Sequence, residues 1–459
     1  MTSPAATAAD LLDRVRRSGL IPAAELDTFL AALPAGESPL PGMLAEKLLT
    51  PFQADRLAAG KFKGFVLGTY VILDKLGAGG MGQVFLAEHT GMRRLVAIKV
   101  LGVAAEDDPG AFERFIREAR AAAAVNHPNI VRVFDLNRDG KLNYLVMEYI
   151  DGLPLGSLVE KGGPSTPGAA ADYARQVGLA LQHGYERGLV HRDVKPNNVM
   201  VDRAGVARLL DLGLVRFERE NDSKLTSQVG GTILGTADYL APEQAVDSST
   251  VDIRADIYGL GATLYFLLAG HPLFPTGKTA QKLMWQQWRE PTPIQELRPD
   301  VPAELAAVLA RALAKKPAGR YPTPQEMVDA LAPFAEPTPV DPGLIPAPPL
   351  RKWTKLTGDV PPPSGRAADR PRLSAASAMD VVLADVPAHR LRSMPAVELP
   401  PRPVLSAPTL SRVGEVTTAS EPVPPLPEPA GPGFWAGILV GAGVLGLAAV
   451  AAGLAVVLR

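Results

Sequence analysis

The densest group of potentially catalytic side chains lies between His191 and Asn198, where the sequence reads His-Arg-Asp-Val-Lys-Pro-Asn-Asn. The Asp193 carboxylate can accept a proton from a hydroxyl group and orient the attacking oxygen. Lys195 can neutralise negative charge that develops in the reaction, and the amide oxygen of Asn198 can bind magnesium. Burying so many polar groups without a function would be costly. These groups are suited to the transfer of a phosphoryl group to a hydroxyl.

A glycine-rich segment upstream could hold the phosphates. Glycines at positions 77, 79 and 82 follow the expected strand 71–73. Glycine allows a tight hairpin whose backbone approaches phosphate oxygens, where a Cβ atom would clash. The GxGxxG pattern alone is a weak signal, because a dinucleotide-binding loop has similar spacing. Here residues 84–87 predict a second strand rather than a helix, which disfavours dinucleotide binding.

Lys99 ends an apolar strand over residues 96–99. Such a lysine is usually a solvated strand end, but together with the glycines it becomes a candidate clamp on the α- and β-phosphates. A carboxylate is then needed to hold the lysine. Glu118 is preferred and Glu113 is the competing candidate, because Glu118 lies directly before a run of small residues.

Together these segments resemble bacterial eukaryotic-like (Hanks-type) serine/threonine protein kinases, over about 265 residues. The resemblance implies an α+β, bilobal protein-kinase fold with a β-rich N-lobe and an α-rich C-lobe. It implies ATP as the phosphate donor and Mg²⁺ as the metal, with Mn²⁺ as an alternative. Asp211-Leu212-Gly213 resembles the magnesium-binding DFG element, with leucine in place of phenylalanine.

The resemblance assigns roles residue by residue. The implied catalytic residues are Asp193, Lys195, Lys99 and Glu118, and the implied metal ligands are Asn198 and Asp211. The implied nucleotide-binding residues are Leu76, Gly77, Ala78, Gly79, Gly80, Met81, Gly82, Gln83, Val84, Ala97, Lys99, Met147, Glu148 and Ile150. Met147 would be the gatekeeper, and the backbone of Glu148 and Ile150 would bond adenine.

The stretch from Gly235 to Glu243 resembles the end of a kinase activation segment. Thr236 would belong to the substrate platform and, with Lys195, favours serine and threonine acceptors over tyrosine. In the family, an arginine placed like Arg192 binds a phosphate on the activation loop. The candidate phosphosites are Thr226, Ser227 and Thr232, and the hypothesis is autophosphorylation at Thr226 or Thr232.

Three further residues are implied to be scaffold. Glu243 is expected to form a buried ion pair with Arg320, and Asp256 to hold the backbone of the catalytic loop.

Overall composition narrows the class of protein. The 459 residues carry a formal net charge of -1, so no basic field favours nucleic acid and we expect no nucleic-acid partner. The resemblance implies that the substrates are proteins. The absence of cysteine excludes disulfides, thiolate nucleophiles and cysteine-ligated metals. The 6 histidines show no ligand spacing such as HExxH, which argues against a metal site built from protein ligands alone.

Changes in composition divide the chain into four predicted parts. Residues 1–64 form a small all-helical N-terminal module of three expected helices, the third of which starts at Thr50-Pro51 as an N-cap and first-position pair. Residues 70–334 form the catalytic domain. Residues 335–433 are proline-rich without apolar periodicity, which predicts a disordered linker. Residues 434–458 form an uncharged run that, at about 1.5 Å per residue, spans roughly 37 Å, enough for a single transmembrane helix. The need for ATP would place the catalytic domain on the cytoplasmic side.

Several alternatives stay open at this stage. The N-terminal module could serve docking or regulation, or be a packing extension of the catalytic domain. The linker could be a spacer or a ligand for proline-binding domains, and the C-terminal run could be a buried core helix. A GxxxG pattern at Gly437 and Gly441 allows a homodimer.

The alternative functions are a pseudokinase that acts as a membrane scaffold, and a small-molecule kinase of related fold. Lys99, Asp193, Asn198 and Asp211 are all present, which disfavours the pseudokinase. The Ala-Pro-Glu element at 241–243 and Thr236 disfavour the small-molecule kinase.

Overall fold

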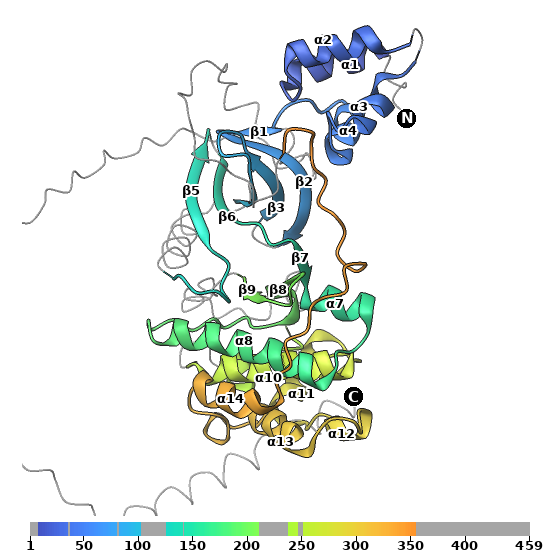
Figure 1. The fold of residues 1–459 in the computed structure, drawn as a ribbon. Helices are drawn as coiled ribbons and strands as arrows, with labels where there is room; N and C mark the ends of the chain where they lie inside the picture. The colour runs from blue at the N-terminus through green and yellow to red at the C-terminus, as the bar shows by residue number, and fades with distance from the viewer. Residues whose placement is uncertain are drawn as a thin grey trace, which may run out of the picture. The chain divides into compact units, whose positions relative to one another are not determined.

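The computed structural model describes residues 8–34, 37–79, 82–101, 125–140, 142–210, 237–246 and 251–354. The predicted catalytic region has the bilobal α+β architecture, with an antiparallel sheet in the N-lobe and mainly helices in the C-lobe (Figure 1). Four short helices precede the sheet. They are α1 (Ala8–Ser18), α2 (Ala23–Ala32), α3 (Pro39–Ala45) and α4 (Pro51–Ala58).

The start of α4 follows the predicted capping pattern. The Thr50 hydroxyl accepts a hydrogen bond from the Gln53 N–H, and the Gln53 side chain accepts one from the Thr50 N–H. This capping box, with Pro51 in the first turn, confirms the expected helix start. Helix α3, which also begins with a proline, was not predicted.

The N-lobe sheet has six strands in the order β1-β2-β3-β4-β6-β5, and all neighbours pair antiparallel. The strands are β1 (Val66–Leu67), β2 (Tyr70–Gly79), β3 (Gly82–His89), β4 (Arg94–Leu101), β5 (Val133–Asp139) and β6 (Leu142–Glu148). Alternate residues of a strand point to opposite faces of the sheet. In β4, Val96 and Ile98 therefore enter one apolar cluster, while Ala97 and Leu101 enter another.

The C-lobe is built around α10, whose residues from Ala255 to Leu268 are all buried. A helix that is apolar on all sides belongs in the centre of a domain. The C-lobe elements are β7 (Gly152–Pro154), α7 (Leu155–Gly162), α8 (Pro167–Tyr185), η1 (Pro196–Asn198), β8 (Val199–Asp202), β9 (Ala207–Leu209), α9 (Pro242–Val246), α10 (Arg254–Ala269), α11 (Thr279–Trp288), α12 (Ile294–Leu297), α13 (Ala303–Ala312), η4 (Pro317–Gly319), α14 (Pro324–Leu331) and η5 (Ala332–Phe334). Strands β7, β8 and β9 form a second sheet of three strands.

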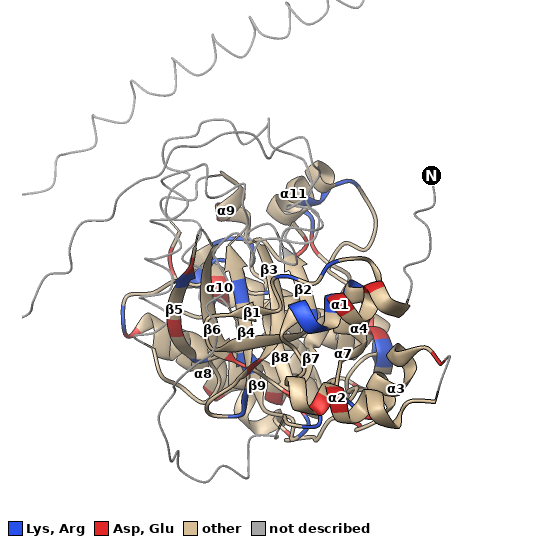
Figure 2. Ribbon diagram, turned by 90° about the horizontal axis from the view of Figure 1, so that it is seen from above, with Lys and Arg blue, Asp and Glu red and all other residues tan. Residues whose placement is uncertain are grey.

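The four N-terminal helices pack against the N-lobe sheet and share a hydrophobic core with it. Seen from above, they lie beside the sheet, away from β5 (Figure 2). Their core side chains, such as Leu26 and Met43, belong to the same buried cluster as Leu73 and Leu86 of the sheet. The module is therefore continuous with the N-lobe, as the packing-extension alternative predicts.

Two polar side chains at the start of α4 fix this contact. The Gln53 side-chain amide donates to the Ile72 carbonyl at 2.6 Å, and the Thr50 hydroxyl donates to the Leu73 carbonyl at 2.6 Å. Both side chains are buried, at 0% and 1% exposure. Strand β2, which leads to the glycine-rich hairpin, is thus hydrogen-bonded to the N-terminal module at Ile72 and Leu73.

The structure corrects the predicted start of the disordered linker. Residues 335–354, here called the C-flanking segment, are placed and packed rather than disordered. Val340 and Ile345 are buried in the C-lobe core, and Leu350 and Trp353 pack against the core of the N-lobe and the module. The prediction failed because these apolar residues are spaced irregularly among prolines. The remainder of the predicted linker lies outside the described residues.

No helix in the described part of the chain is long and apolar enough to cross a membrane. The predicted transmembrane run, residues 434–458, lies outside the described residues.

Replacing Gln53 with leucine should destabilise the N-lobe. The change keeps the size of the side chain but leaves the Thr50 N–H and the Ile72 carbonyl without these partners. We expect the free energy of unfolding to fall by about 2–4 kcal/mol, measured by urea denaturation. Thr28→Ala, which removes a hydrogen bond on the exposed side of α2, is the control and should change it by less than about 0.5 kcal/mol. Equal stability of the two variants would contradict the anchoring role of Gln53.

Candidate active site

The backbone directly before Asp193 is held by a buried carboxylate. The two oxygens of Asp256, which is 1% exposed, accept hydrogen bonds from the N–H groups of His191 and Arg192, each at 2.6 Å. Burial raises the pKa of Asp256 above its ordinary value, whereas the two N–H donors favour its charged form. Arg192 has a φ of 64°, a left-handed conformation that is costly for a residue other than glycine. Asp256 therefore holds the backbone of the catalytic loop, as the family resemblance implied, and stabilises its strained turn.

Asp193 is oriented by two side chains of the same loop. Its Oδ2 accepts hydrogen bonds from Lys195 Nζ at 2.8 Å and from Asn198 Nδ2 at 2.9 Å. Asn198 Nδ2 also donates to the Asp193 carbonyl at 2.8 Å. The Asp193 side chain is 32% exposed, so a hydroxyl group can reach it from solution. Three of the predicted site residues are thus within hydrogen-bond distance of one another.

His191 connects this loop to the end of β9. Its Nδ1 accepts a hydrogen bond from the Asp193 N–H at 3.2 Å, so the ring proton lies on Nε2, which donates to the Leu210 carbonyl at 2.9 Å. The Leu210 N–H in turn donates to the Asn198 carbonyl at 2.8 Å. Leu210 directly precedes Asp211, so the residue before the predicted second metal ligand is hydrogen-bonded to Asn198.

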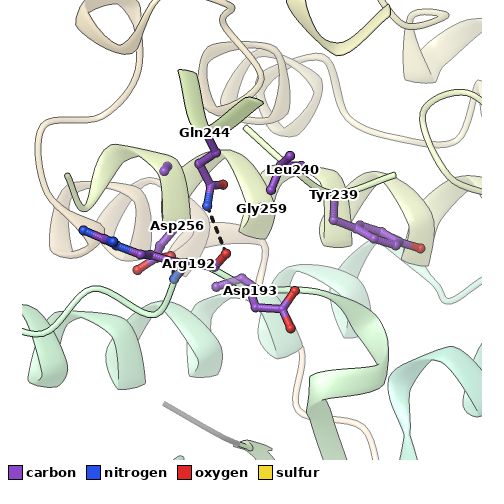
Figure 3. Close-up of a pocket in the computed structure, with 9 residues that line it drawn as sticks. Arg192, Asp193, Tyr239, Leu240, Gln244, Asp256 and Gly259 are labelled. Carbon is purple, nitrogen blue, oxygen red and sulfur yellow. Dashed lines mark hydrogen bonds between the residues drawn. The ribbon is translucent and has the colours of Figure 1, made fainter. Parts of the chain in front are cut away.

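The opposite side of the loop is supported by α9. Gln244 Nε2 donates to the Arg192 carbonyl at 3.0 Å, the dashed line in Figure 3. In the same view Arg192 and Asp193 point in opposite directions from the loop, and Tyr239 lies on the side of Asp193 (Figure 3). Burial raises the pKa of Tyr239, so its hydroxyl stays protonated near neutral pH.

The glycine-rich segment forms the predicted hairpin between β2 and β3. Gly77 pairs with Val84, and Gly79 pairs with Gly82. Gly82 has a φ of 145°, a conformation that other residues rarely adopt. A Cβ atom built on Gly77 would meet no atom within 4 Å, so the hairpin leaves open space beside its backbone. The described part of the hairpin is therefore compatible with a bound phosphate.

Lys99 lies on β4, opposite Val84 on one side and Leu145 on the other. It is half-buried, and its place in the strand puts it on the same face as Ala97 and Leu101. This face lies toward the apolar cluster described next, which places the lysine beside the predicted nucleotide site.

An apolar cluster lies between the two lobes and contains several predicted nucleotide-binding residues. Its buried members are Ala97, Leu101, Val131, Leu145, Met147 and Ile150, and Val84, Val133, Leu136, Met200 and Leu210 pack against them. Met200 and Leu210 come from the C-lobe and were not predicted. The alternation of Val199 and Val201 with Met200 in a short strand was the available signal. Such a surface can hold a flat aromatic base.

The structure reduces the number of backbone groups that could bond adenine at residues 148–150, the hinge between the two lobes. The Glu148 N–H donates to the Arg132 carbonyl at 2.9 Å. Of the two backbone groups of Glu148, the carbonyl is therefore the candidate partner for adenine. Ile150 is buried at 7% exposure.

Comparison with known proteins agrees with this geometry. A family model described as the protein kinase domain matches residues 70–331. The chain belongs to the protein kinase family. A similar relative is the serine/threonine-protein kinase PknB of Mycolicibacterium smegmatis, 38% identical over 309 residues, which are 64% of this chain and 49% of PknB.

Two further similar proteins are kinases by name. The serine/threonine-protein kinase Pkn1 of Myxococcus xanthus is 40% identical over 262 residues, covering 56% of this chain and 37% of Pkn1. The crystal structure of the Mycobacterium tuberculosis PknI kinase domain is 31% identical, covers 60% of this chain and 98% of that domain, and has a TM-score of 0.45. The chain spans less than half the length of PknB and Pkn1.

The predicted scaffold ion pair of the kinase C-lobe is present. Arg320 Nη1 and Nη2 donate to the two oxygens of Glu243 at 2.6 and 2.8 Å. Arg320 is 1% exposed, and its guanidinium also donates to three backbone carbonyls. A buried cation with this many acceptors is well compensated. The pair fixes the start of α9, and with it Gln244, beside the catalytic loop.

Helix α11 holds the chain just after Thr236, in a manner that the sequence did not reveal. Gln286, which is 0% exposed, donates to the carbonyls of Ala237 at 3.3 Å and Asp238 at 2.8 Å, and accepts from the Tyr258 hydroxyl. Lys282 Nζ lies 2.7 Å from Asp238 Oδ1. Helices α10 and α11 therefore fix the backbone at Ala237 and Asp238, directly after the predicted platform residue Thr236.

Several predicted site residues lie outside the described residues. They are Gly80, Met81, Glu118, Asp211, Thr226, Ser227, Thr232 and Thr236. The choice between Glu113 and Glu118 also falls there, so these assignments remain predictions.

Replacing Asp256 with asparagine should loosen the catalytic loop. An amide group offers one acceptor oxygen, and its NH₂ would face a second backbone N–H donor. We expect a loss of about 1–3 kcal/mol in the free energy of unfolding. We also expect faster hydrogen exchange at the amides of His191 and Arg192, measured by NMR or mass spectrometry. The control is Asp300→Asn, because Asp300 is 55% exposed; protection at 191 and 192 that matches this control would contradict the anchoring role of Asp256.

Proposed function

We propose that this chain is an ATP-dependent serine/threonine protein kinase that phosphorylates proteins. Membership of the protein kinase family and the names of the similar relatives support the reaction class. The observation that carries the proposal is the Asp193 carboxylate, which is partly exposed to solution and is oriented by Lys195 and Asn198. Lys195, together with the predicted platform residue Thr236, supports serine and threonine acceptors.

In the proposed reaction, a serine or threonine hydroxyl attacks the γ-phosphorus of ATP and the bond to the β-phosphate oxygen breaks. The hydroxyl proton passes to Oδ1 or Oδ2 of Asp193. The backbone directly before Asp193 is held by Asp256. Lys195, bonded to Asp193, is placed to neutralise charge on the transferred group. Lys99 and the glycine hairpin hold the remaining phosphates, and positioning supplies most of the rate acceleration.

The residues present fit a magnesium ion at the predicted position. The amide nitrogen of Asn198 is engaged by Asp193, which leaves its amide oxygen as the group for a metal. Oxygen donors are what magnesium prefers, with Asp211 as the second predicted ligand. When bound, the ion would neutralise charge on the ATP phosphates.

Replacing Asp193 with asparagine should abolish most phosphotransfer. The asparagine cannot accept the hydroxyl proton, so we expect the rate to fall by about 10²–10⁴-fold. The 459-residue chain would be incubated with labelled ATP, magnesium and a serine- and threonine-containing peptide, and label would be mapped by mass spectrometry. Asp300→Asn is the matched control. Equal labelling by wild type and Asp193→Asn would refute the catalytic role, and label at Thr226 or Thr232 would support autophosphorylation of the activation loop.

We further propose that residues 434–458 anchor the protein as a single membrane-spanning helix, with the catalytic domain in the cytoplasm. The uncharged length of this run supports the anchor, and the need for ATP supports the orientation.

Deleting 434–458 should move the protein from the membrane pellet to the supernatant after carbonate extraction. A variant with the nearby linker residues 401–425 deleted is the control, and it should remain in the pellet. Retention of both variants in the pellet would contradict the anchor. A homodimer through Gly437 and Gly441 remains a prediction.

A further inference from the structure

The end of the C-flanking segment is bound by both the N-terminal module and the N-lobe. Arg351, which is 5% exposed, donates from Nη1 to the Leu20 carbonyl at 2.9 Å. Its Nη2 lies 3.4 Å from Oε2 of Glu88, whose side chain is fully buried on β3. The Thr354 hydroxyl donates to the same Glu88 oxygen at 2.7 Å. The buried Glu88 carboxylate thus binds the segment through the Arg351 guanidinium and the Thr354 hydroxyl.

The module supplies the other half of this contact. The Lys352 N–H donates to the Lys47 carbonyl at 2.9 Å, and Lys352 Nζ forms an ion pair with Glu25 on α2. Trp353 packs against the shared core of module and N-lobe. The contact therefore combines a backbone hydrogen bond, two ion pairs and an aromatic side chain. Arginine and aromatic side chains are residue types that are enriched in protein interfaces.

The beginning of the same segment is fixed to the C-lobe. Val340 and Ile345 are each 4% exposed in the C-lobe core. The Val340 N–H donates to the Arg203 carbonyl at 3.2 Å, and Arg203 Nη2 donates to the Ile345 carbonyl at 3.3 Å. Arg203 also forms an ion pair with Asp151, directly after the hinge.

Only a short stretch joins the two attachments. Residues 346–349 read Pro-Ala-Pro-Pro. Four residues span at most about 14 Å when fully extended, and proline-rich chain is stiff. In Figure 1 the orange trace runs from the C-lobe helices past α7 and β7 to the region of β1 and α4. The segment therefore crosses from one lobe to the other beside the hinge.

We propose that the N-terminal module is a docking site for a basic, aromatic peptide, that its occupant is this chain's own segment 350–354, and that the docked segment ties the two lobes together. Kinase lobes must move apart to exchange nucleotides. The segment limits that motion from the hinge side as long as Arg351 occupies its site. This inference does not depend on the phosphotransfer proposed above, since its readouts are distances and amide exchange.

The distance between the lobes tests the tie directly. Because the chain lacks cysteine, spin labels can be attached to cysteines introduced at Met92 and Tyr185, which are 50% and 42% exposed. Arg351→Met should broaden the distribution of label distances in the nucleotide-free protein, measured by pulsed EPR. Arg16→Met is the matched control, because Arg16 is a 60% exposed arginine of the same module. Indistinguishable distributions in the two variants would overturn the proposal.

A second measurement uses exposed residues, so it does not risk the fold. Glu25→Lys should speed exchange of the Lys352 amide about two- to fivefold, because one surface ion pair is lost. The combined change Glu25→Lys and Lys352→Glu should restore the slow rate. Exchange that does not respond to the single change, or is not restored by the double change, would show that the segment is not docked through these groups.

Discussion

The catalytic loop depends on one interaction, the acceptance of two backbone N–H groups by the buried carboxylate of Asp256. Without these bonds the left-handed turn at Arg192 would lose two of the hydrogen bonds that offset its strain, which is of the order of 1–3 kcal/mol. The turn lets Arg192 and Asp193 project in opposite directions from consecutive positions (Figure 3). Bonds from Lys195 and Asn198 can then orient Asp193 because the backbone beneath them is fixed. The carboxylate belongs to α10, the helix around which the C-lobe is built, so the loop is attached directly to the packed core.

Lys99 illustrates how packing singles out functional positions. Strand β4 is covered on both faces, and from Leu95 to Leu101 Lys99 is the sole charged residue. Covering both faces explains why the strand is continuously apolar rather than alternating. A charged group in such a strand breaks the local rule, and exceptions of this kind tend to mark functional sites.

The parts of the structure that are encoded locally could be predicted from the sequence. The hairpin at Gly77–Gly82, the cap at Thr50 and the roles of Glu243 and Asp256 all follow from short motifs or from the family resemblance they carry. Contacts made by a lone polar side chain to distant backbone groups could not be predicted. Gln286 is an example, because its partners at 237 and 238 leave no periodic trace in either segment.

The C-flanking segment was missed for a related reason. Its composition resembles that of disordered chain, yet two apolar anchors in each lobe are enough to order an extended stretch whose prolines already restrict the unfolded state. Composition averages over the segment, whereas order here depends on a few positions. Whether an extended segment is ordered therefore depends on the protein surface against which its few apolar residues pack.

The shared core of module, sheet and C-flanking segment also bears on how the catalytic domain can be handled as a fragment. The family match begins at residue 70, beside this shared core, and ends at Leu331, which is buried with Val340 and Ile345 of the C-flanking segment in the C-lobe core. A protein cut there would expose Leu73, Leu86 and Leu95 to water, although all three are almost fully buried in the intact chain. A contiguous apolar patch of this kind promotes self-association. The boundaries that keep the domain soluble are therefore wider than those that define its family.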